Sequence, residues 1–245
     1  MIKVSIFVPI YNEEEVIKEN VIKIYNKLTQ LKYVFELFLI DDNSNDKTPQ
    51  ICKKLAMNHS RIKYLRFTNG PTRRENLAKS FKKANYDLIF FMDADLSTDL
   101  KHVHELVHSI SNGQDIVIGS RHIKNAIVHR NLSRRVVSFL FNKFVRLYFK
   151  SNIYDHECGF KIFKKKVIFN LLNELKYDFK LKRKMLWDTE LLLRAQKNNY
   201  LISEIPILWI AGKKSALRFF SETSMISYLL NLKKEQLKKL NLLKL

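Results

Sequence analysis

The sequence is poor in the residues that interrupt secondary structure and in those that cross-link chains. Its 245 residues include five glycines, four prolines and two cysteines. So few glycines and prolines leave little room for flexible linkers or low-complexity tracts. The two cysteines, Cys52 and Cys158, form neither a zinc-binding spacing nor a disulfide framework. We therefore expect one domain from a reducing compartment, followed by a C-terminal appendage.

Long hydrophobic runs are also missing. The longest uncharged run, Thr223–Leu232, has ten residues, about half of the ~20 that a helix needs to span a bilayer. The N-terminus passes directly into a strand pattern with a charge at Lys3, which is not typical of a signal peptide. We expect a protein that does not cross a membrane but could lie on one. The expected location is cytoplasmic, on the inner face of the membrane.

Acidic residues are scarce relative to basic ones. The chain has 24 Asp and Glu against 44 Lys and Arg, a net charge of +20. Such a surface attracts nucleic acid, anionic lipid headgroups or phosphorylated small molecules, although a lysine-rich solvated surface is the simpler explanation. Because no helix-turn-helix, zinc or RNA-binding signature is found, we do not expect a nucleic-acid partner.

In the first half, short apolar strands alternate with amphipathic helices. The expected strands are Val4–Pro9, Phe35–Ile40, Ile62–Phe67, Leu88–Met92 and Ile116–Ile118. Helical patterns lie between them, at Val16–Leu31, from Thr48 onward, at Arg73–Ala84 and at Leu100–Ile110. Thr48 is the expected N-cap of its helix, with Pro49 in the first helical position. This alternation predicts an α/β fold with a mostly parallel sheet and helices on both faces.

Polar residues follow three of these strands: Asn12-Glu13, Asp41-Asp42, and Asp93 with Asp95. In parallel sheets, ligands bind at the carboxyl ends of the strands, where these residues should converge. Two carboxylates at i and i+2 on an extended segment point the same way. Asp93 and Asp95 could therefore hold a hard divalent cation together with diphosphate oxygens.

The second half contains a strongly basic amphipathic segment. Arg130–Lys150 has six Arg or Lys and no acidic residue, beside a broad apolar face. Basic, aromatic helices of this kind commonly lie in the membrane interface, but a core-packing helix with a solvated basic edge would have the same pattern. The residues after Ser227 form another Lys- and Leu-rich amphipathic stretch, which we expect to be a helix, a partner surface or a membrane contact.

Taken together and in order, several motifs resemble those of family-two glycosyltransferases. The first-half motifs are Val8-Pro9-Ile10-Tyr11-Asn12-Glu13-Glu14, Asp41-Asp42-Asn43-Ser44-Asn45-Asp46, Asp93-Ala94-Asp95 and Gly119-Ser120-Arg121. The second-half motifs resemble the dolichyl-phosphate glucosyltransferase branch, at Cys158-Gly159-Phe160-Lys161-Ile162-Phe163, Trp187-Asp188-Thr189-Glu190-Leu191-Leu192 and Glu204-Ile205-Pro206-Ile207, with Trp209 and Lys214-Ser215. The similarity extends from about Val4 to Leu217. We therefore expect a catalytic domain over 1–217 and a basic helical tail over 218–245.

The resemblance implies a GT-A fold and a role for each motif. The nucleotide sugar would be bound by Pro9, Tyr11, Glu13, Asp41, Asp42 and Asp93, with Asp41 on the base or ribose. Asp93 and Asp95 would hold Mg²⁺ or Mn²⁺ with the diphosphate. Arg121, Arg134 and Ser138 would grip the phosphate of the acceptor, a chemistry that suits arginine. Asp95, Arg121 and Asp188 are the catalytic candidates.

The implied reaction is an inverting transfer of a hexose from a nucleotide sugar, UDP-glucose, to dolichyl or polyprenyl phosphate. An ionised phosphate needs no general base, so catalysis would be positioning and charge neutralisation. The alternatives are a GDP-mannose-dependent dolichyl-phosphate mannose synthase, a transferase to a glycan hydroxyl with Asp188 as base, a basic nucleic-acid-binding protein, and a catalytically dead scaffold. Two departures from the family bear on the donor. Ser97-Thr98 stands where many relatives have Gln, and the Gly70–Asn76 loop lacks the usual glycines.

Overall fold

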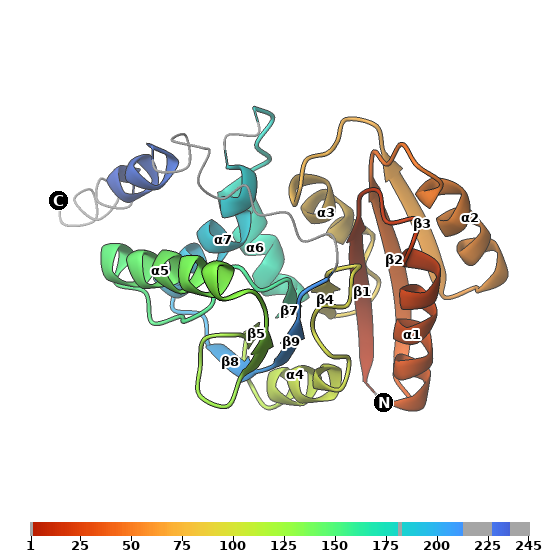
Figure 1. Cartoon of the computed structure of the whole chain (residues 1–245), viewed down its shortest axis with the longest axis horizontal. Helices are drawn as coiled ribbons and strands as arrows, with labels where there is room; N and C mark the ends of the chain where they lie inside the picture. The colour runs from red at the N-terminus through yellow and green to blue at the C-terminus, as the bar shows by residue number, and fades with distance from the viewer. Residues whose placement is uncertain (1, 181–182, 213–226, 236–245) are drawn as a thin grey trace.

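A seven-stranded sheet runs through the molecule in the strand order β3-β2-β1-β4-β7-β5-β8. The computed structural model describes residues 2–180, 183–212 and 227–235 of the chain. Figure 1 shows helices against both faces of this sheet. Two short strands, β6 and β9, pair in a separate small sheet.

The strands are β1 (Lys3–Ile10), β2 (Val34–Asp42), β3 (Ile62–Phe67), β4 (Leu88–Met92), β5 (Ile116–Ser120), β6 (Ile127–His129), β7 (Phe160–Lys164), β8 (Ile202–Pro206) and β9 (Leu208–Ile210). The helices are α1 (Ile17–Gln30), α2 (Thr48–Asn58), α3 (Glu75–Ser80), α4 (His102–Ser111), α5 (Leu132–Phe149), α6 (Lys165–Leu175) and α7 (Trp187–Lys197). Two 3₁₀ turns, Phe81–Lys83 and Lys184–Leu186, complete the series, and residues 227–235 are also helical.

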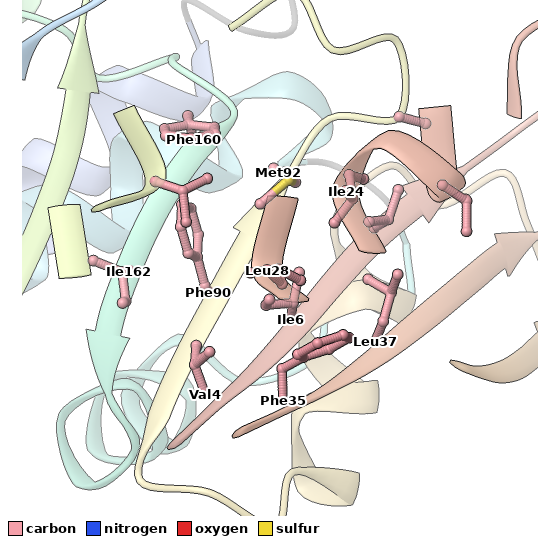
Figure 2. Close-up of a cluster of buried hydrophobic side chains, with 14 of the residues drawn as sticks. Val4, Ile6, Ile24, Leu28, Phe35, Leu37, Phe90, Met92, Phe160 and Ile162 are labelled. Carbon is pink, nitrogen blue, oxygen red and sulfur yellow. The ribbon is translucent and has the colours of Figure 1, made fainter. Parts of the chain in front are cut away.

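Both faces of the central strands are buried, which explains their nearly continuous apolar sequences. On β1, Val4, Ile6 and Val8 contribute to a core shared with α1, α2 and α4. Phe7 points to the opposite core, which contains residues of α3, α6 and α7. Figure 2 shows the first of these cores between the sheet and α1. The predicted α/β class, with a mostly parallel sheet and helices on both faces, is confirmed.

Strand β7 is the exception to the parallel arrangement, since it pairs antiparallel with both β4 and β5. The sequence pattern predicted neither this strand nor its direction. A short buried apolar run does not by itself distinguish a strand from a helix, and it contains no signal of a strand's direction. The pairing matters for function because Phe160, at the start of β7, lies opposite Met92 at the end of β4. The residues before β7 therefore join the carboxyl ends of the parallel strands at one edge of the sheet.

Several helix boundaries differ from the sequence prediction. Lys47, and not Thr48, occupies the N-cap position of α2. The Asp46 carboxylate accepts a hydrogen bond from the Thr48 amide instead, while the Thr48 hydroxyl accepts one from Glu13. The α-helix α3 is shorter than Arg73–Ala84, because the 3₁₀ turn Phe81–Lys83 follows it. Helix α5 begins at Leu132, capped by the Asn131 side chain, and not at Arg130.

Helix α5 packs against the rest of the molecule along one side only. Val145 and Phe149 lie in a small apolar cluster with Leu186, Leu193 and, from the helical segment 227–235, Leu229 and Leu232. Figure 1 shows this segment close to α5. The predicted tail therefore includes a helix that packs on α5, while residues 218–226 and 236–245 of that tail lie outside the described residues. No helix in the described ranges has the length and hydrophobicity needed to span a bilayer.

Phe7 offers a test of how much the sheet core contributes to stability. Its ring is fully buried, stacks on Phe38 at a centroid distance of 4.6 Å and meets the edge of Phe81 at 4.9 Å. We expect Phe7→Ala to lower the free energy of unfolding by about 3–5 kcal/mol, because it removes burial and leaves a cavity. Urea denaturation followed by circular dichroism measures the change. Phe179→Ala is the matched control, since Phe179 is 87% exposed, and its effect should stay within about 0.5 kcal/mol. Equal losses in the two variants would contradict this picture of the core.

Candidate active site

A cleft of about 540 Å³ opens at the carboxyl ends of β1, β2 and β4. It is lined by Pro9, Ile10, Tyr11, Glu13, Asp42, Pro71, Arg73, Arg74, Asp93, Ala94 and Asp95. All the residues that the sequence motifs assigned to the donor, except Asp41, therefore lie on one cleft. Their individual roles remain predictions.

The loops that follow β1 and β2 are fastened to each other by hydrogen bonds. The Asn12 amide donates to the Ser44 hydroxyl at 3.0 Å, and the Asn45 amide donates to the Asn12 side-chain oxygen at 2.9 Å. Asn12 and Asn43 both adopt positive φ angles, of 56° and 74°, a conformation that asparagine tolerates better than most residues. These contacts hold Tyr11 and Glu13 at the rim of the cleft.

The two neighbouring carboxylates at the end of β2 have different surroundings. Asp41 is fully buried and accepts hydrogen bonds from the Ser44 amide at 2.8 Å and the Tyr64 hydroxyl at 2.5 Å. Asp42 lines the cleft and accepts bonds from the Thr72 amide and the Asn76 side chain, at 2.6 and 2.7 Å. Asp41 thus stabilises the loop after β2 from inside the protein, whereas Asp42 lines the cavity.

The Asp93 and Asp95 carboxylates lie together after β4. The Asp93 amide donates to the Gly159 carbonyl at 3.0 Å, and a Cβ on Gly159 would come within 1.9 Å of the Asp93 carboxylate. Partial burial, followed by the charges of Asp95 and Asp188, raises the pKa of Asp93 despite the opposing charge of Arg74. Asp95 accepts hydrogen bonds from the amide and hydroxyl of Ser97, at 3.0 and 2.6 Å. This crowding of carboxylates is of the kind that a cation relieves.

The donor set suits a hard divalent cation that shares its coordination with a substrate. Asp93 and Asp95 supply carboxylate oxygens, the ligands that Mg²⁺ and Mn²⁺ prefer. Within the described residues there is no cluster of three or more His, Cys, Asp or Glu that could hold a metal alone. Two carboxylates that leave several coordination positions to water or diphosphate fit an ion that arrives with a nucleotide.

Two cations neutralise the candidate base, Asp188. One carboxylate oxygen accepts from Lys161 at 2.8 Å and the other from Arg74 at 3.1 Å. Burial acts to raise the pKa of Asp188, but the charges of Lys161 and Arg74 outweigh it and hold the pKa below its ordinary value. Neither Lys161 nor Arg74 was singled out from the sequence. Lys161 in particular lies in an apolar run, and the contact that explains it spans 27 residues.

A group of basic side chains lies beside the end of β5, on the acceptor side of the predicted site. Arg121 forms a two-pronged salt bridge with the buried Asp155, at 2.7 and 2.8 Å. Burial acts to raise the pKa of Asp155, but the charge and hydrogen bonds of Arg121 hold it below its ordinary value. The Arg121 guanidinium is therefore already paired with a carboxylate inside the protein. Ser138 lies close by, with its hydroxyl 3.1 Å from His122 Nε2.

No sequence motif marked Arg130 as a site residue. Its guanidinium lies 5.2 Å from the ring centroid of Trp209, and Arg121 lies 5.6 Å from the same ring. Arg130 Nε is buried with no hydrogen-bond partner among the described residues. Burial and the charges of Arg121 and Arg134 lower the pKa of Arg130. A buried guanidinium donor without a partner, close to other arginines, is the kind of group that an anion would satisfy.

Glu157 is close enough to both Asp188 and Arg121 for their charges to act on it. Burial, followed by the charge of Asp188, raises its pKa to about 7, against lowering contributions from Lys161 and Arg121. Its carboxylate accepts a hydrogen bond from the Thr189 hydroxyl. No sequence signal marked Glu157, because Asp188, Thr189 and Arg121, which act on it, lie far from it in the sequence.

Comparison with known proteins places the chain among glycosyltransferases. The model of glycosyl transferase family 2 matches residues 5–172. The glycosyltransferase AglD of Haloferax volcanii is 32% identical over 212 residues, which cover 85% of this chain and 33% of AglD. The dolichyl-phosphate beta-glucosyltransferase of Saccharomyces cerevisiae is 26% identical over 238 residues, covering 87% of this chain and 69% of that enzyme. The chain thus spans about a third of the length of AglD.

A solved structure supports the fold independently. Glucosyl-3-phosphoglycerate synthase from Mycobacterium tuberculosis, crystallised with Mn²⁺, UDP and phosphoglyceric acid, superimposes with a TM-score of 0.64 at 18% identity. The superposition covers 94% of this chain and 78% of the synthase. At this identity the likeness concerns the fold alone. The resemblance first drawn from the sequence motifs is confirmed: this chain belongs to glycosyl transferase family 2 and has the GT-A fold.

Proposed function

We propose that this chain transfers a hexose from a nucleotide sugar, UDP-glucose, to the phosphate of a polyprenyl or dolichyl lipid, with inversion at the anomeric carbon. The observation that carries the proposal is the pairing of a carboxylate-lined donor cleft with an arginine group that contains an unpaired buried donor. The match to the yeast dolichyl-phosphate beta-glucosyltransferase supports both the sugar and the acceptor.

On the donor side, Asp93 and Asp95 would hold Mg²⁺ or Mn²⁺, which neutralises the charge that develops on the leaving diphosphate. The Mn²⁺ in the mycobacterial synthase supports this assignment. Tyr11 is 42% exposed at the cleft rim, where its ring can stack on the nucleotide base. Asp42 and Glu13 can accept hydrogen bonds from sugar hydroxyls. Asp41 contributes indirectly, because it holds the loop that presents Asp42.

The state of Asp188 favours a phosphate acceptor over a hydroxyl. A phosphate oxygen is already ionised near neutral pH and attacks without a general base, whereas a hydroxyl must lose its proton. Asp188 is poorly suited to take that proton, because both its oxygens are bound by cations and its pKa is low. Transfer to a glycan hydroxyl is the second candidate, with Glu157 as base, because burial and the charge of Asp188 raise its pKa and a raised pKa favours taking up a proton.

For the acceptor phosphate we propose Arg130, Arg134 and Ser138 as direct ligands. The family resemblance assigns Arg121 to the phosphate. Its guanidinium already donates two hydrogen bonds to Asp155, so we propose that Arg121 mainly positions the neighbouring residues. Trp209 holds Arg121 and Arg130 near one another through cation–π contacts. The N-terminus of α5, which follows Arg130 directly, adds a favourable dipole for an anion.

A product assay tests the reaction. Purified protein with Mg²⁺ or Mn²⁺ and a short polyprenyl phosphate is incubated with UDP-glucose, GDP-mannose or UDP-N-acetylglucosamine, and the lipid is analysed by mass spectrometry. We expect a hexosyl phospholipid from UDP-glucose. Asp95→Ala should reduce turnover by at least about 100-fold, because it removes charge stabilisation that acts on the transition state, while its circular dichroism spectrum stays unchanged. Full activity of Asp95→Ala would refute the donor assignment, and a product from GDP-mannose alone would correct the sugar.

Arg130 can be tested separately with a soluble short-chain acceptor. We expect Arg130→Ala to raise the KM for the polyprenyl phosphate by about tenfold or more, the usual effect of losing a charge-assisted hydrogen bond. The KM for the nucleotide sugar should change little, and Arg130→Lys should fall between the two. Lys143→Ala removes one charge from an exposed position of α5, the helix that follows Arg130, and serves as the control. An unchanged acceptor KM in Arg130→Ala would exclude Arg130 as a phosphate ligand.

We further propose that α5 docks on an anionic membrane surface. Opposite its packed side the helix exposes a large apolar stripe, made up of Leu132, Val136, Phe139, Leu140, Phe144 and Leu147. Apart from the adjacent Phe139 and Leu140, these residues are spaced three or four positions apart and so share one helical face. Arg135 and Lys143 are exposed on the same helix, which contains no acidic residue. Each basic residue near an anionic surface contributes about 1 kcal/mol of attraction.

Vesicle flotation tests the docking surface. We expect the protein to float with vesicles of phosphatidylcholine and phosphatidylglycerol, and less with phosphatidylcholine alone. Leu140→Glu with Leu147→Glu should abolish flotation, because both side chains, 54% and 73% exposed, lie on the stripe. Met57→Glu introduces a charge at an 86% exposed apolar position on α2 and should float like the unmodified protein. Undiminished flotation of the double variant would rule out α5 as the contact.

A further inference from the structure

Arg74 bridges the carboxylate assigned to the metal and the carboxylate assigned as candidate base. Its Nη2 donates to Asp93 Oδ1 at 3.0 Å, and its Nε donates to Asp188 Oδ2 at 3.1 Å. The guanidinium also lies over the ring of Phe91, 5.1 Å from its centroid. The side chain is 17% exposed and lines the donor cleft. A cation therefore already occupies the space between the two carboxylates.

The backbone before α3 directs Arg74 into this position. The Thr72 amide and hydroxyl both donate to Asp42, which fixes the loop at the cleft. Arg73 adopts a φ of 65°, a left-handed conformation that is uncommon for residues other than glycine. The position of Arg74 is thus determined by the loop that precedes α3.

The two ends of the Arg74 bridge differ in how firmly they are held. Asp188 is 5% exposed and has a second partner in the fully buried Lys161. Asp93 is 44% exposed and faces the cavity with Asp95. The bond to Asp93 is the one that solvent and ligands reach, so it breaks first when another cation approaches. After that break, the bond to Asp188 still holds the guanidinium at the cleft wall.

We propose that Arg74 is a resident cation that the divalent metal displaces from Asp93, and that the freed guanidinium then binds the diphosphate of the nucleotide. Metal and Arg74 compete for the same carboxylate, so the metal alone binds weakly. A diphosphate removes the competition because its oxygens accept hydrogen bonds from Arg74 and also coordinate the metal. Metal and nucleotide therefore bind with positive coupling, and each raises the affinity for the other by the same factor.

This inference rests on the proposed donor chemistry, but its test needs neither sugar nor acceptor. Isothermal titration calorimetry measures Mn²⁺ alone, and then UDP at saturating Mn²⁺, on the full chain. For Arg74→Ala we expect several-fold tighter binding of Mn²⁺ alone and about tenfold weaker binding of UDP, the loss typical of one charge-assisted hydrogen bond. Opposite signs in the two titrations distinguish displacement from a general loss of structure, which would weaken both.

Two further variants sharpen the result. Arg74→Lys keeps the charge but cannot bridge two carboxylates with one planar fork, so both affinities should fall between those of Arg74→Ala and the unmodified protein. Arg73→Ala removes the same charge from an exposed residue of the same cleft, and its affinity for Mn²⁺ alone should change by less than about twofold, since exposed charges are screened.

The outcomes separate the two proposals. If the unmodified protein binds UDP with Mn²⁺ but Arg74→Ala binds Mn²⁺ alone no more tightly, or UDP no more weakly, then the role given to Arg74 is wrong and the donor site stands. If the unmodified protein binds neither UDP nor GDP with Mn²⁺, the donor assignment itself fails.

Discussion

The ion pair between Lys161 and Asp188 is the contact on which the rest of the site depends. Lys161 is fully buried in the middle of the sheet, and Asp188 on α7 is its carboxylate partner at 2.8 Å. A buried charge without its partner costs several kcal/mol, so the pair favours the arrangement in which the start of α7 lies next to Lys161. Asp188 in turn holds Arg74, which holds Asp93. One chain of alternating charges thus connects β7, α7, the loop before α3 and the end of β4.

The sequence was informative wherever a position in the fold follows from a local pattern. Asp93 and Asp95 could be predicted to lie at the carboxyl edge of the sheet because two carboxylates directly after an apolar strand form a local signal. The lining of Pro9, Tyr11, Glu13 and Asp42 on one cleft followed from parallel strands ending at one edge. Contacts distant in sequence could not be predicted. Packing between remote segments determines three features of the site. They are the ion pair of Asp155 with Arg121, the antiparallel direction of β7 and the position of Arg130 over Trp209.

Trp209 contacts both the segment that holds the proposed metal ligands and the arginines proposed to bind the acceptor phosphate. It pairs with Thr98 in an isolated bridge, and the Ile210 amide donates to the Ser97 carbonyl at 2.7 Å. Ser97 is also the residue whose amide and hydroxyl hold Asp95. The same tryptophan lies against Arg121 and Arg130. A short strand, β9, therefore sets the separation between the proposed metal ligands and the proposed phosphate ligands, which transfer between two bound substrates requires.

If α5 lies on a membrane as proposed, the position of the acceptor follows from the geometry of that one helix. Its exposed apolar stripe includes Leu132 in the first turn, next to Arg130 and Arg134. A helix lying in the interface places its axis near the level of the lipid headgroups. The phosphate of a polyprenyl lipid sits at that same level, with its chain in the hydrocarbon. The proposed phosphate ligands would then meet the phosphate where it already lies, and no free energy would be needed to extract the lipid chain into water. Docking and substrate binding would be two consequences of the same amphipathic pattern.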